Sequence, residues 1–476
     1  MIDSLSLLSV IILLPFVGML FALSSKEDEN GGGHNAFNVA LFSVGANLVL
    51  ILRVFYNLDL QKNGLQLIER FNWLENPNID IIFGADIFSV VTIMAVHIAF
   101  IIGLFGVRRQ PRQKAMMIFG LLFLSLVTGF FLAADIFSFY IFFEAMLFPL
   151  FMLIGIYGNI RRDGVIYRFF LYNFLGSVVL FLAVIILYNH QDGLLEISRF
   201  GSLKLGAKIE YFMLTSIFIS FLSRIPIWPF HYWISSISSN IRNPLVFIMT
   251  NILPLTGIYG FMRFLPQEIS APVAFYVSGL EIVAVITMVF IALIGFTNRD
   301  VQYKFFSYIT VYYIMYLLAL LNYGELTRMN IAFSCFSYLI IIAVLEFLAD
   351  YLHFEQEEKG INPDGSLCAV PRISFVYSFF ILAAVGLPVS SLFLNNFLIV
   401  SRLMGKNLNM GLLVVFSLTL VSGALLKDLY RLKDRSRVSP DKPCVVDISR
   451  RSYAFLMIIM FILLMSSVKP LWFLGV

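Results

Sequence analysis

The chain has 476 residues, of which 60% are hydrophobic and 13% are charged, and its mean hydropathy is +0.89. This composition lies outside the range of water-soluble globular domains. The distribution of the net charge of +4 along the loops is more informative than its size, and no nucleic-acid partner is expected. We therefore expect an integral membrane protein.

A membrane-spanning backbone must satisfy its own hydrogen bonds, so only helices and closed barrels cross the lipid. Long apolar runs lack the alternation of a barrel, which predicts an all-α polytopic protein without a separate soluble domain. Apolar runs of roughly 20 residues predict about 14 spans, the fifth of which covers 137–158. The other bounded spans are 5–23, 36–56, 86 to the basic cluster at 108–114, 165–188, 209–229, 244–264, 272–296, 304–321, 329–353, 373–404 (interrupted), 411–427 and 453–468.

The charge of the loops predicts the orientation of the chain. Loops that precede even-numbered spans hold about twenty Lys and Arg, including those of 427–451, whereas the other loops hold about nine. The positive-inside rule places the basic loops in the cytoplasm or matrix, so both termini lie on the opposite side. No cleavable presequence precedes the first apolar run, which is consistent with synthesis inside an organelle.

Glu144 is the only formally charged residue in the fifth span. An acid at the centre of a lipid-embedded helix costs on the order of 3 kcal/mol, and such residues usually face a polar interior and take part in ion or proton movement. This position makes proton chemistry the first functional hypothesis.

Two later spans contain helix breakers. Pro226 and Pro229 lie in the run SRIPIWPFHYW, and Gly386 and Pro388 lie in VGLPVSSLFLNN. Proline leaves backbone carbonyls free at membrane depth, which is tolerated only where protein or a water-filled cavity surrounds them. A pair of interrupted spans is also typical of inverted-repeat transporters, although simple proline kinks remain an alternative.

Several further charged side chains lie at span depth near these breaks. Carboxylates and bases in a low-dielectric interior change each other's proton affinity, which is how a proton site is loaded and emptied. The alternative is a set of static ion pairs that hold helices together, with other side chains snorkelling to the interface. The candidates are Arg168, Arg224, His231 within the first break, Glu281, Lys304 and Glu346, whereas Asp86, Arg263, Asp350 and His353 are interpreted as interfacial.

The sequence indicates no metal or redox centre. Cys335, Cys368 and Cys444 are far apart and odd in number, and the five histidines form no i, i+4 pair on a helix. Phosphate-binding loops, dinucleotide fingerprints and haem attachment motifs are also absent from the sequence. We therefore expect no cofactor and no metal in this chain.

Six runs of the chain form a recognisable set of motifs. The first is the fifth-span run FYIFFEAMLFPLFMLIGIYGN, and the others are YRFFLYNFLGS at 167–177, RIPIWPFHYWI at 224–234, GIYGFMRF at 257–264, RDVQYKFFSYITV at 299–311 and GLPVSSLFLNNF at 386–397. Together they resemble subunit 4 (chain M in bacteria) of respiratory NADH:ubiquinone oxidoreductase, or complex I. The fifth-span run is the most specific of them, because its continuation after Glu144 separates subunit 4 from the related subunits 2 and 5.

The resemblance implies an antiporter-like fold with two inverted five-helix repeats in the membrane arm of complex I. It divides the chain into an N-terminal three-helix segment (1–106), a first repeat (107–265), a second repeat (266–428), and a basic loop with a C-terminal helix (429–476). It also implies a multi-pass protein of the mitochondrial inner membrane that contacts subunit 2-like and subunit 5-like neighbours, accessory subunits and lipids such as cardiolipin. FMN, iron–sulfur clusters and ubiquinone are expected in other subunits.

In the family, the fifth-span glutamate pairs with a seventh-span lysine, and protons pass an eighth-span lysine toward a titratable twelfth-span group. Here these positions correspond to Arg224, Leu255 and Asn396, and a tenth-span histidine corresponds to Tyr313. Guanidinium effectively never loses its proton, and leucine and asparagine do not titrate. Either Glu281, Lys304, Glu346 and water carry protons instead, or proton conduction in this subunit is weakened or lost; we favour the second account.

Two other functions remain open at this stage. A subunit of a multi-subunit Na⁺/H⁺ antiporter would share the fold and the fifth-span glutamate. A solute carrier would need a polar pocket at the breaks, which Ser390, Ser391, Asn395 and Asn396 could line.

Overall fold

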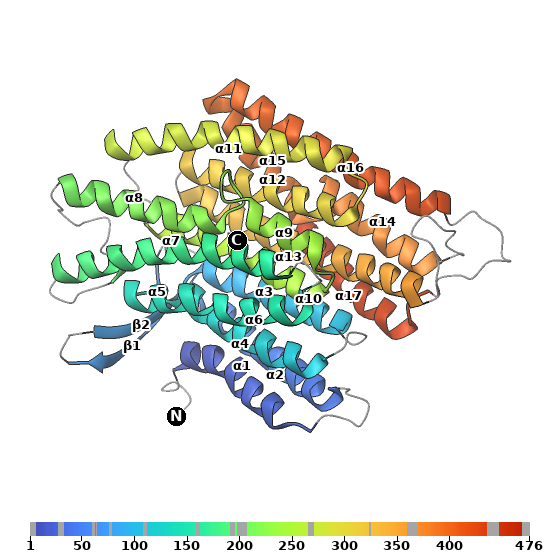
Figure 1. Cartoon of the computed structure of the whole chain (residues 1–476), viewed down its shortest axis with the longest axis horizontal. Coiled ribbons are helices and arrows are strands. Elements are labelled where there is room, and N and C mark those ends of the chain that lie inside the picture. The colour runs from blue at the N-terminus through green and yellow to red at the C-terminus, as the bar shows by residue number, and fades with distance from the viewer. Residues whose placement is uncertain are drawn as a thin grey trace.

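The computed structural model describes thirteen parts of the chain, and within them it forms the helices α1–α17 and one β-hairpin (Figure 1). The described residues are 6–26, 33–59, 62, 64–75, 79–107, 112–158, 162–190, 196–197, 207–264, 271–322, 325–358, 370–435 and 447–468. Cys368, Cys444 and most of the basic loop at 429–449 lie outside the described residues.

The first half of the bundle consists of α1 Leu7–Ser24, α2 His34–Asn57, α3 Ile87–Val107, α4 Gln113–Leu132, α5 Ile136–Ala145, α6 Leu147–Tyr157, α7 Arg162–His190, α8 Ala207–Arg224, α9 Tyr232–Asn240 and α10 Pro244–Phe264. The second half consists of α11 Ala271–Thr297, α12 Val301–Asn322, α13 Glu325–Glu358, α14 Pro371–Val385, α15 Ser391–Lys406, α16 Leu408–Arg435 and α17 Arg450–Val468.

The described part of the chain holds 12 spans that are long and apolar enough to cross a membrane, with α5 and α6 forming one of them. The chain is therefore a multi-pass membrane protein. There are also two pairs of shorter helices, α8 with α9 and α14 with α15. Within each pair, one of the predicted proline-containing breaks separates the first helix from the second. The predicted total of 14 crossings would require each pair to cross once, and that total stays a prediction.

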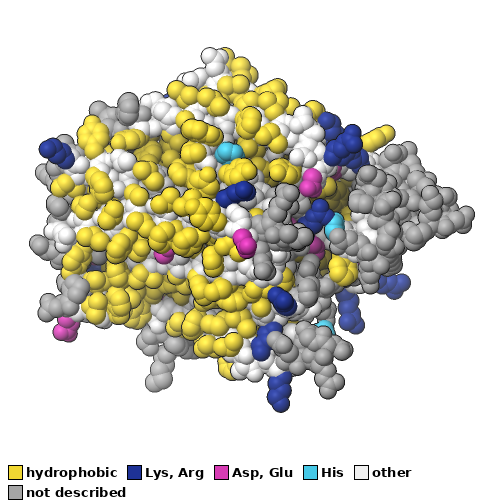
Figure 2. Space-filling view, viewed as in Figure 1, with side chains coloured by type: hydrophobic (Ala, Val, Ile, Leu, Met, Phe, Trp, Pro, Cys, Tyr) yellow, Lys and Arg dark blue, Asp and Glu magenta, His cyan; other side chains and the backbone are white. Residues whose placement is uncertain are grey.

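Four helices form the centre of the bundle. In the most apolar 18-residue stretch of each helix, all residues of α10 and α13 are buried, as are 89% of those of α12 and 83% of those of α3. In α17 only 28% are buried. Apolar side chains form broad areas on the left and centre of the face drawn in Figure 2. This is the arrangement expected in lipid, where the outer face needs no polar surface and the polar groups gather inside.

The hairpin of β1 (Gln66–Leu74) and β2 (Ile79–Ala85) is a difference from the purely helical expectation. It lies at one end of the bundle beside α5 (Figure 1). The Glu69 carboxylate accepts hydrogen bonds from the Leu8 and Ser9 amides at 2.7 and 3.0 Å, and so binds the free N–H groups at the start of α1. The Ile82 amide donates to Asp135, which also caps α5.

Candidate functional site

Glu144 and Arg224 lie in the same region but do not touch directly. Arg224 ends α8, is 0% exposed, and donates from Nη2 to the Phe143 carbonyl at 2.7 Å, with its guanidinium carbon 4.0 Å from the Phe143 ring centre. The half-buried Glu144 acts on Arg224 electrostatically, yet forms no ion pair within 4.0 Å among the described residues, and its Oε2 has no hydrogen-bond partner there. Arg224 therefore binds the backbone one residue before the acid.

The close packing of α10 on α8 positions Arg224. A Cβ atom at Gly257 would lie 2.6 Å from the Phe221 carbonyl oxygen and 3.2 Å from the Arg224 Cβ, so only glycine permits this approach. The close approach of α10 therefore fixes the backbone at the end of α8, while the guanidinium lies against Phe143 of α5.

The first break, between α8 and α9, contains Pro226 and Pro229 as predicted. Other helices and the segment itself satisfy the freed backbone groups: the Trp233 indole donates to the Ser223 carbonyl at 3.1 Å, and the Trp228 amide donates to Thr287 of α11 at 3.2 Å. His231 lies at the start of α9, and its Nδ1 is buried without a hydrogen-bond partner in the described residues.

The second break begins at Gly386, whose φ of +95° ends α14. The Gly386 amide donates to the Ala383 carbonyl and the Leu387 amide donates to the Leu382 carbonyl, which together make a Schellman motif. Pro388 follows two residues later and prevents the helix from resuming at once.

Hydroxyl groups from three helices satisfy the carbonyls at this second break. Tyr308 and Tyr312 of α12 donate to the Ala384 carbonyl at 3.3 and 3.1 Å. Ser422 of α16 donates to the Val385 carbonyl at 3.5 Å, and Ser467 of α17 donates to the Pro388 carbonyl at 3.3 Å. The carbonyls at the break are therefore hydrogen-bonded within the protein, while Leu387 and Pro388 themselves are exposed.

Replacing Gly386 with alanine is expected to destabilise the protein by roughly 1–2 kcal/mol, because a side chain disfavours the left-handed region even where space is open. Gly279→Ala is the matched control, since its added Cβ also meets nothing within 4 Å but lies within α11, where alanine favours the helix. The thermal unfolding midpoint of the detergent-purified protein measures both. Equal midpoints for the two variants would contradict the strain argument.

Arg168 and Glu281 lie nearer the surface than Arg224. Arg168 of α7 donates to Ser236 of α9 at 3.2 Å, and its guanidinium carbon lies 4.9 Å from the centre of the Tyr232 ring. Glu281 of α11 lies 3.9 Å from the Lys406 ammonium at the end of α15. Both contacts join neighbouring helices, which fits the alternative reading of static pairs.

Lys304 and Glu346 each make a buried polar contact near the start of α12, at the opposite end of that helix from Lys406. Lys304 is 1% exposed and pairs with Asp428 of α16. Glu346 of α13 is fully buried, and its two carboxylate oxygens accept from the Gln302 side-chain amide at 3.0 and 3.2 Å. Asp428 and Gln302 were not identified from the sequence.

Two positions at which the resemblance implies titratable side chains carry the neutral residues Leu255 and Asn396. Leu255 is 0% exposed on α10, and Asn396 of α15 accepts a hydrogen bond from Ser334 of α13 at 3.4 Å. Beside them lie buried tyrosines that the sequence reasoning missed. Their i, i+4 spacing at Tyr308, Tyr312 and Tyr316 was a signal that could have found them.

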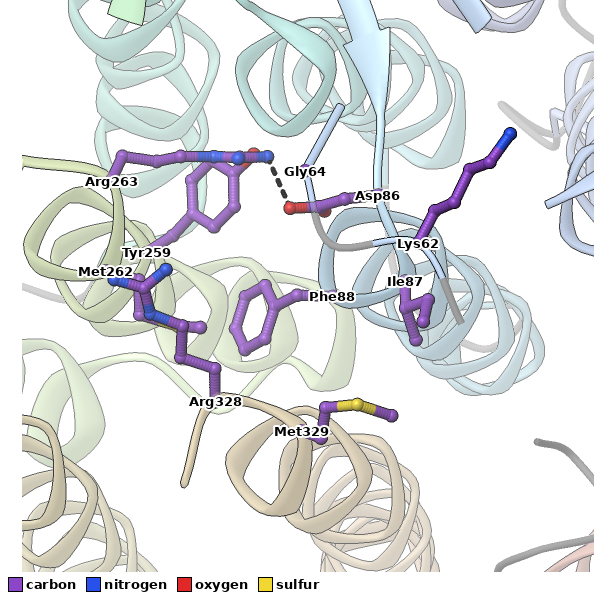
Figure 3. Close-up of a pocket in the computed structure, with 10 residues that line it drawn as sticks. All are labelled: Lys62, Gly64, Asp86, Ile87, Phe88, Tyr259, Met262, Arg263, Arg328 and Met329. Carbon is purple, nitrogen blue, oxygen red and sulfur yellow. Dashed lines mark hydrogen bonds and ion pairs between the residues drawn. The ribbon is translucent and has the colours of Figure 1, made fainter. Parts of the chain in front are cut away.

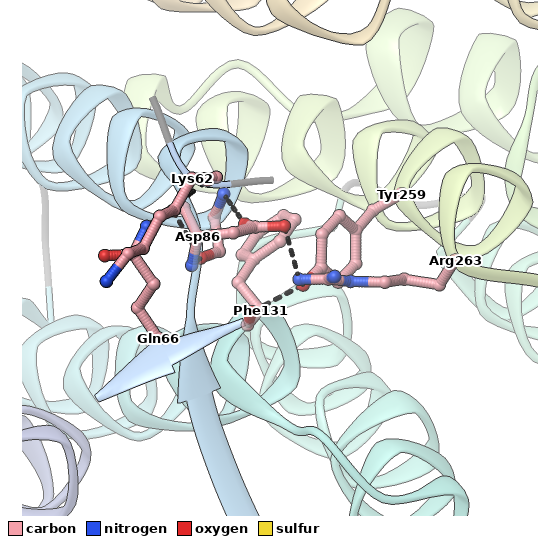
Figure 4. Close-up of polar contacts among 7 residues, drawn as sticks. Lys62, Gln66, Asp86, Phe131, Tyr259 and Arg263 are labelled. Carbon is pink, nitrogen blue, oxygen red and sulfur yellow. Dashed lines mark hydrogen bonds and ion pairs between the residues drawn. The ribbon is translucent and has the colours of Figure 1, made fainter. Parts of the chain in front are cut away.

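A pocket of about 270 Å³ opens at the end of the bundle where α3 begins and α10 ends. Asp86 and Arg263, interpreted from the sequence as interfacial, form an ion pair of 2.9 Å at its edge, with side chains 21% and 14% exposed. Arg263 also donates to the Tyr259 hydroxyl, which donates to the Phe131 carbonyl at 2.7 Å (Figure 4). The full lining is Lys62, Gly64, Asp86, Ile87, Phe88, Tyr259, Met262, Arg263, Arg328 and Met329 (Figure 3).

The amino-acid sequence that forms these helices and breaks matches a known family. The sequence pattern of the family described as "NADH:quinone oxidoreductase/Mrp antiporter, TM" matches residues 133–422, well over half of the chain. The chain belongs to this family. The match includes both helix breaks and all the charged candidates from Glu144 to Glu346.

Relatives and solved structures agree with the family assignment. NADH-quinone oxidoreductase subunit M of Rickettsia prowazekii is 27% identical over 90% of this chain and 87% of its own length. NADH-ubiquinone oxidoreductase chain 4 of Arabidopsis thaliana is 26% identical over 84% and 81%.

Two solved structures show the same fold. A chain of respiratory complex I from Thermus thermophilus superposes with a TM-score of 0.84 at 20% identity, over 98% of this chain and 96% of that one. A chain of the Mrp complex from Dietzia superposes with a TM-score of 0.77 at 16% identity, over the same shares. The predicted antiporter-like helical fold is therefore confirmed, while the domain boundaries at 106, 265 and 428 stay predictions.

Proposed function

We propose that this member of the NADH:quinone oxidoreductase/Mrp antiporter family is an antiporter-like membrane-arm subunit of respiratory complex I. It would couple electron transfer from NADH to ubiquinone, carried out in other subunits, to proton translocation. The observation that carries this proposal is the similarity to subunit M and chain 4 proteins along 84–90% of the chain. FMN, iron–sulfur clusters and ubiquinone would bind elsewhere in the complex.

We further propose that proton conduction through this subunit is weakened or lost. Arg224 is fixed on the Phe143 carbonyl and its guanidinium effectively keeps its proton. Leu255 and Asn396 cannot take up protons at the positions where the family carries titratable groups. Glu144 would then act through its charge on neighbouring groups rather than as one link in a relay.

The proposed location is the mitochondrial inner membrane. The support for it is the similarity to two plant proteins named NADH-ubiquinone oxidoreductase chain 4. The basic loops would face the matrix and both termini the intermembrane space. Subunit 2-like and subunit 5-like chains, accessory subunits and lipids such as cardiolipin are the proposed neighbours.

Cross-linking in intact membranes, followed by native-gel separation, tests this proposal. The chain should migrate with NADH:ubiquinone oxidoreductase activity and cross-link to two other antiporter-like chains. Migration apart from all quinone-reducing activity would contradict it.

The alternative is a subunit of a multi-subunit Na⁺/H⁺ antiporter, which the fold shared with a chain of the Mrp complex favours. In that case the chain would migrate with Na⁺-dependent dissipation of a pH gradient in vesicles and not with NADH oxidation. The same fractions can be assayed for both activities, so one preparation separates the two functions.

A further inference from the structure

Five buried tyrosines form a compact group in the second half of the bundle. Tyr308, Tyr312, Tyr313 and Tyr316 of α12 and Tyr338 of α13, here called the tyrosine cluster, are each at most 3% exposed. The ring centroids of Tyr308 and Tyr312 lie 4.4 Å apart, and those of Tyr313 and Tyr338 lie 5.4 Å apart. The rings therefore contact each other across α12 and α13.

The cluster occupies the place where titratable groups are expected in the family. On one side it contacts Asn251 of α10, one turn before Leu255: the Tyr313 hydroxyl donates to the Asn251 carbonyl at 2.6 Å and the Tyr338 hydroxyl donates to its side-chain oxygen at 3.0 Å. On the other side it reaches the second break, where the Tyr312 hydroxyl also interacts with Asn396.

The direction of these hydrogen bonds decides what the cluster can do. A proton relay needs groups that accept one proton and donate another onward. Tyr308 and Tyr312 both donate to the Ala384 carbonyl, and Tyr313 and Tyr338 both donate to oxygens of Asn251. Carbonyl and amide oxygens carry no proton to pass on, so each of these donors ends at a terminal acceptor.

The Tyr308 and Tyr312 hydroxyls also hydrogen-bond to each other, and Tyr312 to Asn396, but this short line ends at the Asn396 amide, which does not titrate. The Tyr316 hydroxyl has no hydrogen-bond partner among the described residues. The cluster therefore presents short, separate donor contacts rather than a continuous chain.

The cluster also separates two charged ends of the same helix. Lys304 lies near the start of α12, and Asn322, the last residue of α12, accepts a hydrogen bond from Lys406, which neighbours Glu281. At 1.5 Å per residue, the section from Tyr308 to Tyr316 spans about 12 Å along the axis. A neutral, ring-filled section of that length lies between the charged groups.

We propose that the tyrosine cluster is a proton seal that closes the second half of this subunit to proton transfer between the Lys304 end and the Lys406 end. The inference rests on the proposed membership in complex I, and it assigns a barrier function to tyrosines of which Tyr313 stands at a position that is titratable in the family. The rings fill the space that water would otherwise occupy, and hydrogen bonds from the hydroxyls hold the rings against α10 and the second break.

Two kinds of substitution in the tyrosine cluster distinguish a seal from a proton relay: tyrosine to phenylalanine removes only the hydroxyl, and tyrosine to alanine removes the whole ring. In sealed membrane vesicles that contain the whole complex, Tyr312→Phe, Tyr313→Phe and Tyr338→Phe should leave the number of protons translocated per electron unchanged, because phenylalanine keeps the bulk. Tyr313→Ala and Tyr338→Ala should raise passive proton leak severalfold, since a cavity lined by hydroxyl and amide groups holds water. Leak is read from the decay of an imposed pH gradient without NADH.

Phe123→Ala is the matched control for loosened packing, because it removes a similar ring, also 0% exposed, from α4 in the first half of the bundle. It should not raise the leak. A lower proton-to-electron ratio in the phenylalanine variants would overturn the seal in favour of a hydroxyl relay. An unchanged leak in assembled alanine variants would also overturn it.

The two proposals fail in different ways. If the native chain does not migrate with NADH:ubiquinone activity, the proposed function is wrong. If it does, and the phenylalanine variants pump fewer protons per electron, only the seal is wrong. The phenylalanine variants keep this test decisive if the alanine variants do not assemble.

Discussion

Asp428→Asn is expected to reduce the amount of assembled complex more than any other single change to a charged pair in this chain. Lys304 is 1% exposed, and Asp428 is its only ion-pair partner in the described part of the chain. Breaking a buried pair by removing one partner leaves an uncompensated charge and costs on the order of 3 kcal/mol or more. Native-gel quantification of the assembled complex and the thermal midpoint of the purified complex measure this loss.

Two controls test whether the buried charge is the cause. The double variant Asp428→Leu with Lys304→Met removes both charges, and should recover most of the lost stability because apolar replacement of a whole buried pair is often neutral. Lys406→Met breaks the Glu281 contact, which is 3.9 Å long with a 47% exposed lysine, and should cost less than about 1 kcal/mol. A double variant as unstable as Asp428→Asn would refute the charge argument.

The spans and the two breaks could be predicted because their signals are local. Apolar length placed the span that the structure forms as α10, Pro244–Phe264, and the Gly–Leu–Pro run placed the end of α14 at Gly386. A glycine with a proline shortly after it ends a helix through the backbone preferences of these two residues, whichever residues lie nearby in space.

The partners of the buried groups could not be predicted in the same way. Lys304 and Asp428 are 124 positions apart, and Gln302 and Glu346 are 44 apart, so their contacts depend on how α12, α13 and α16 pack. The same limit applies to Glu144 and Arg224, which stand at positions that the resemblance implies are paired, whereas the structure places Arg224 on the neighbouring Phe143 carbonyl. Sequence spacing cannot distinguish the Glu144 carboxylate from the adjacent Phe143 backbone carbonyl as the group that Arg224 binds.

The hairpin was missed for another reason. Residues 66–85 mix apolar and charged side chains and fall outside every apolar run, so a search for spans passes over them. Their Ile, Phe and Trp side chains are a strand signal, which a search for apolar runs of roughly 20 residues does not use.

Arg224→Met is expected to lower the assembled complex about tenfold or more, because a cost of about 1.4 kcal/mol already changes an equilibrium tenfold. The change removes the buried donor of the Phe143 carbonyl and the cation that interacts electrostatically with the half-buried Glu144. Methionine keeps much of the side-chain volume, so packing on Gly257 and Phe143 changes little while the charge and the hydrogen bond to the Phe143 carbonyl are lost. Arg168→Met is the matched control, since Arg168 is only half-buried and makes a 3.2 Å bond to Ser236. Its expected loss is less than about 1 kcal/mol.

The acid itself decides how the Arg224→Met result is read. If the loss comes from an uncompensated Glu144, then Glu144→Gln in the Arg224→Met background should restore most of the assembled complex, because the amide needs no cation. If the loss comes from the freed Phe143 carbonyl, the second change should restore nothing, since that carbonyl stays without its donor. Recovery would show that the charge of Arg224 matters more than its hydrogen bond, and full assembly of Arg224→Met alone would show that Glu144 needs no neighbouring cation.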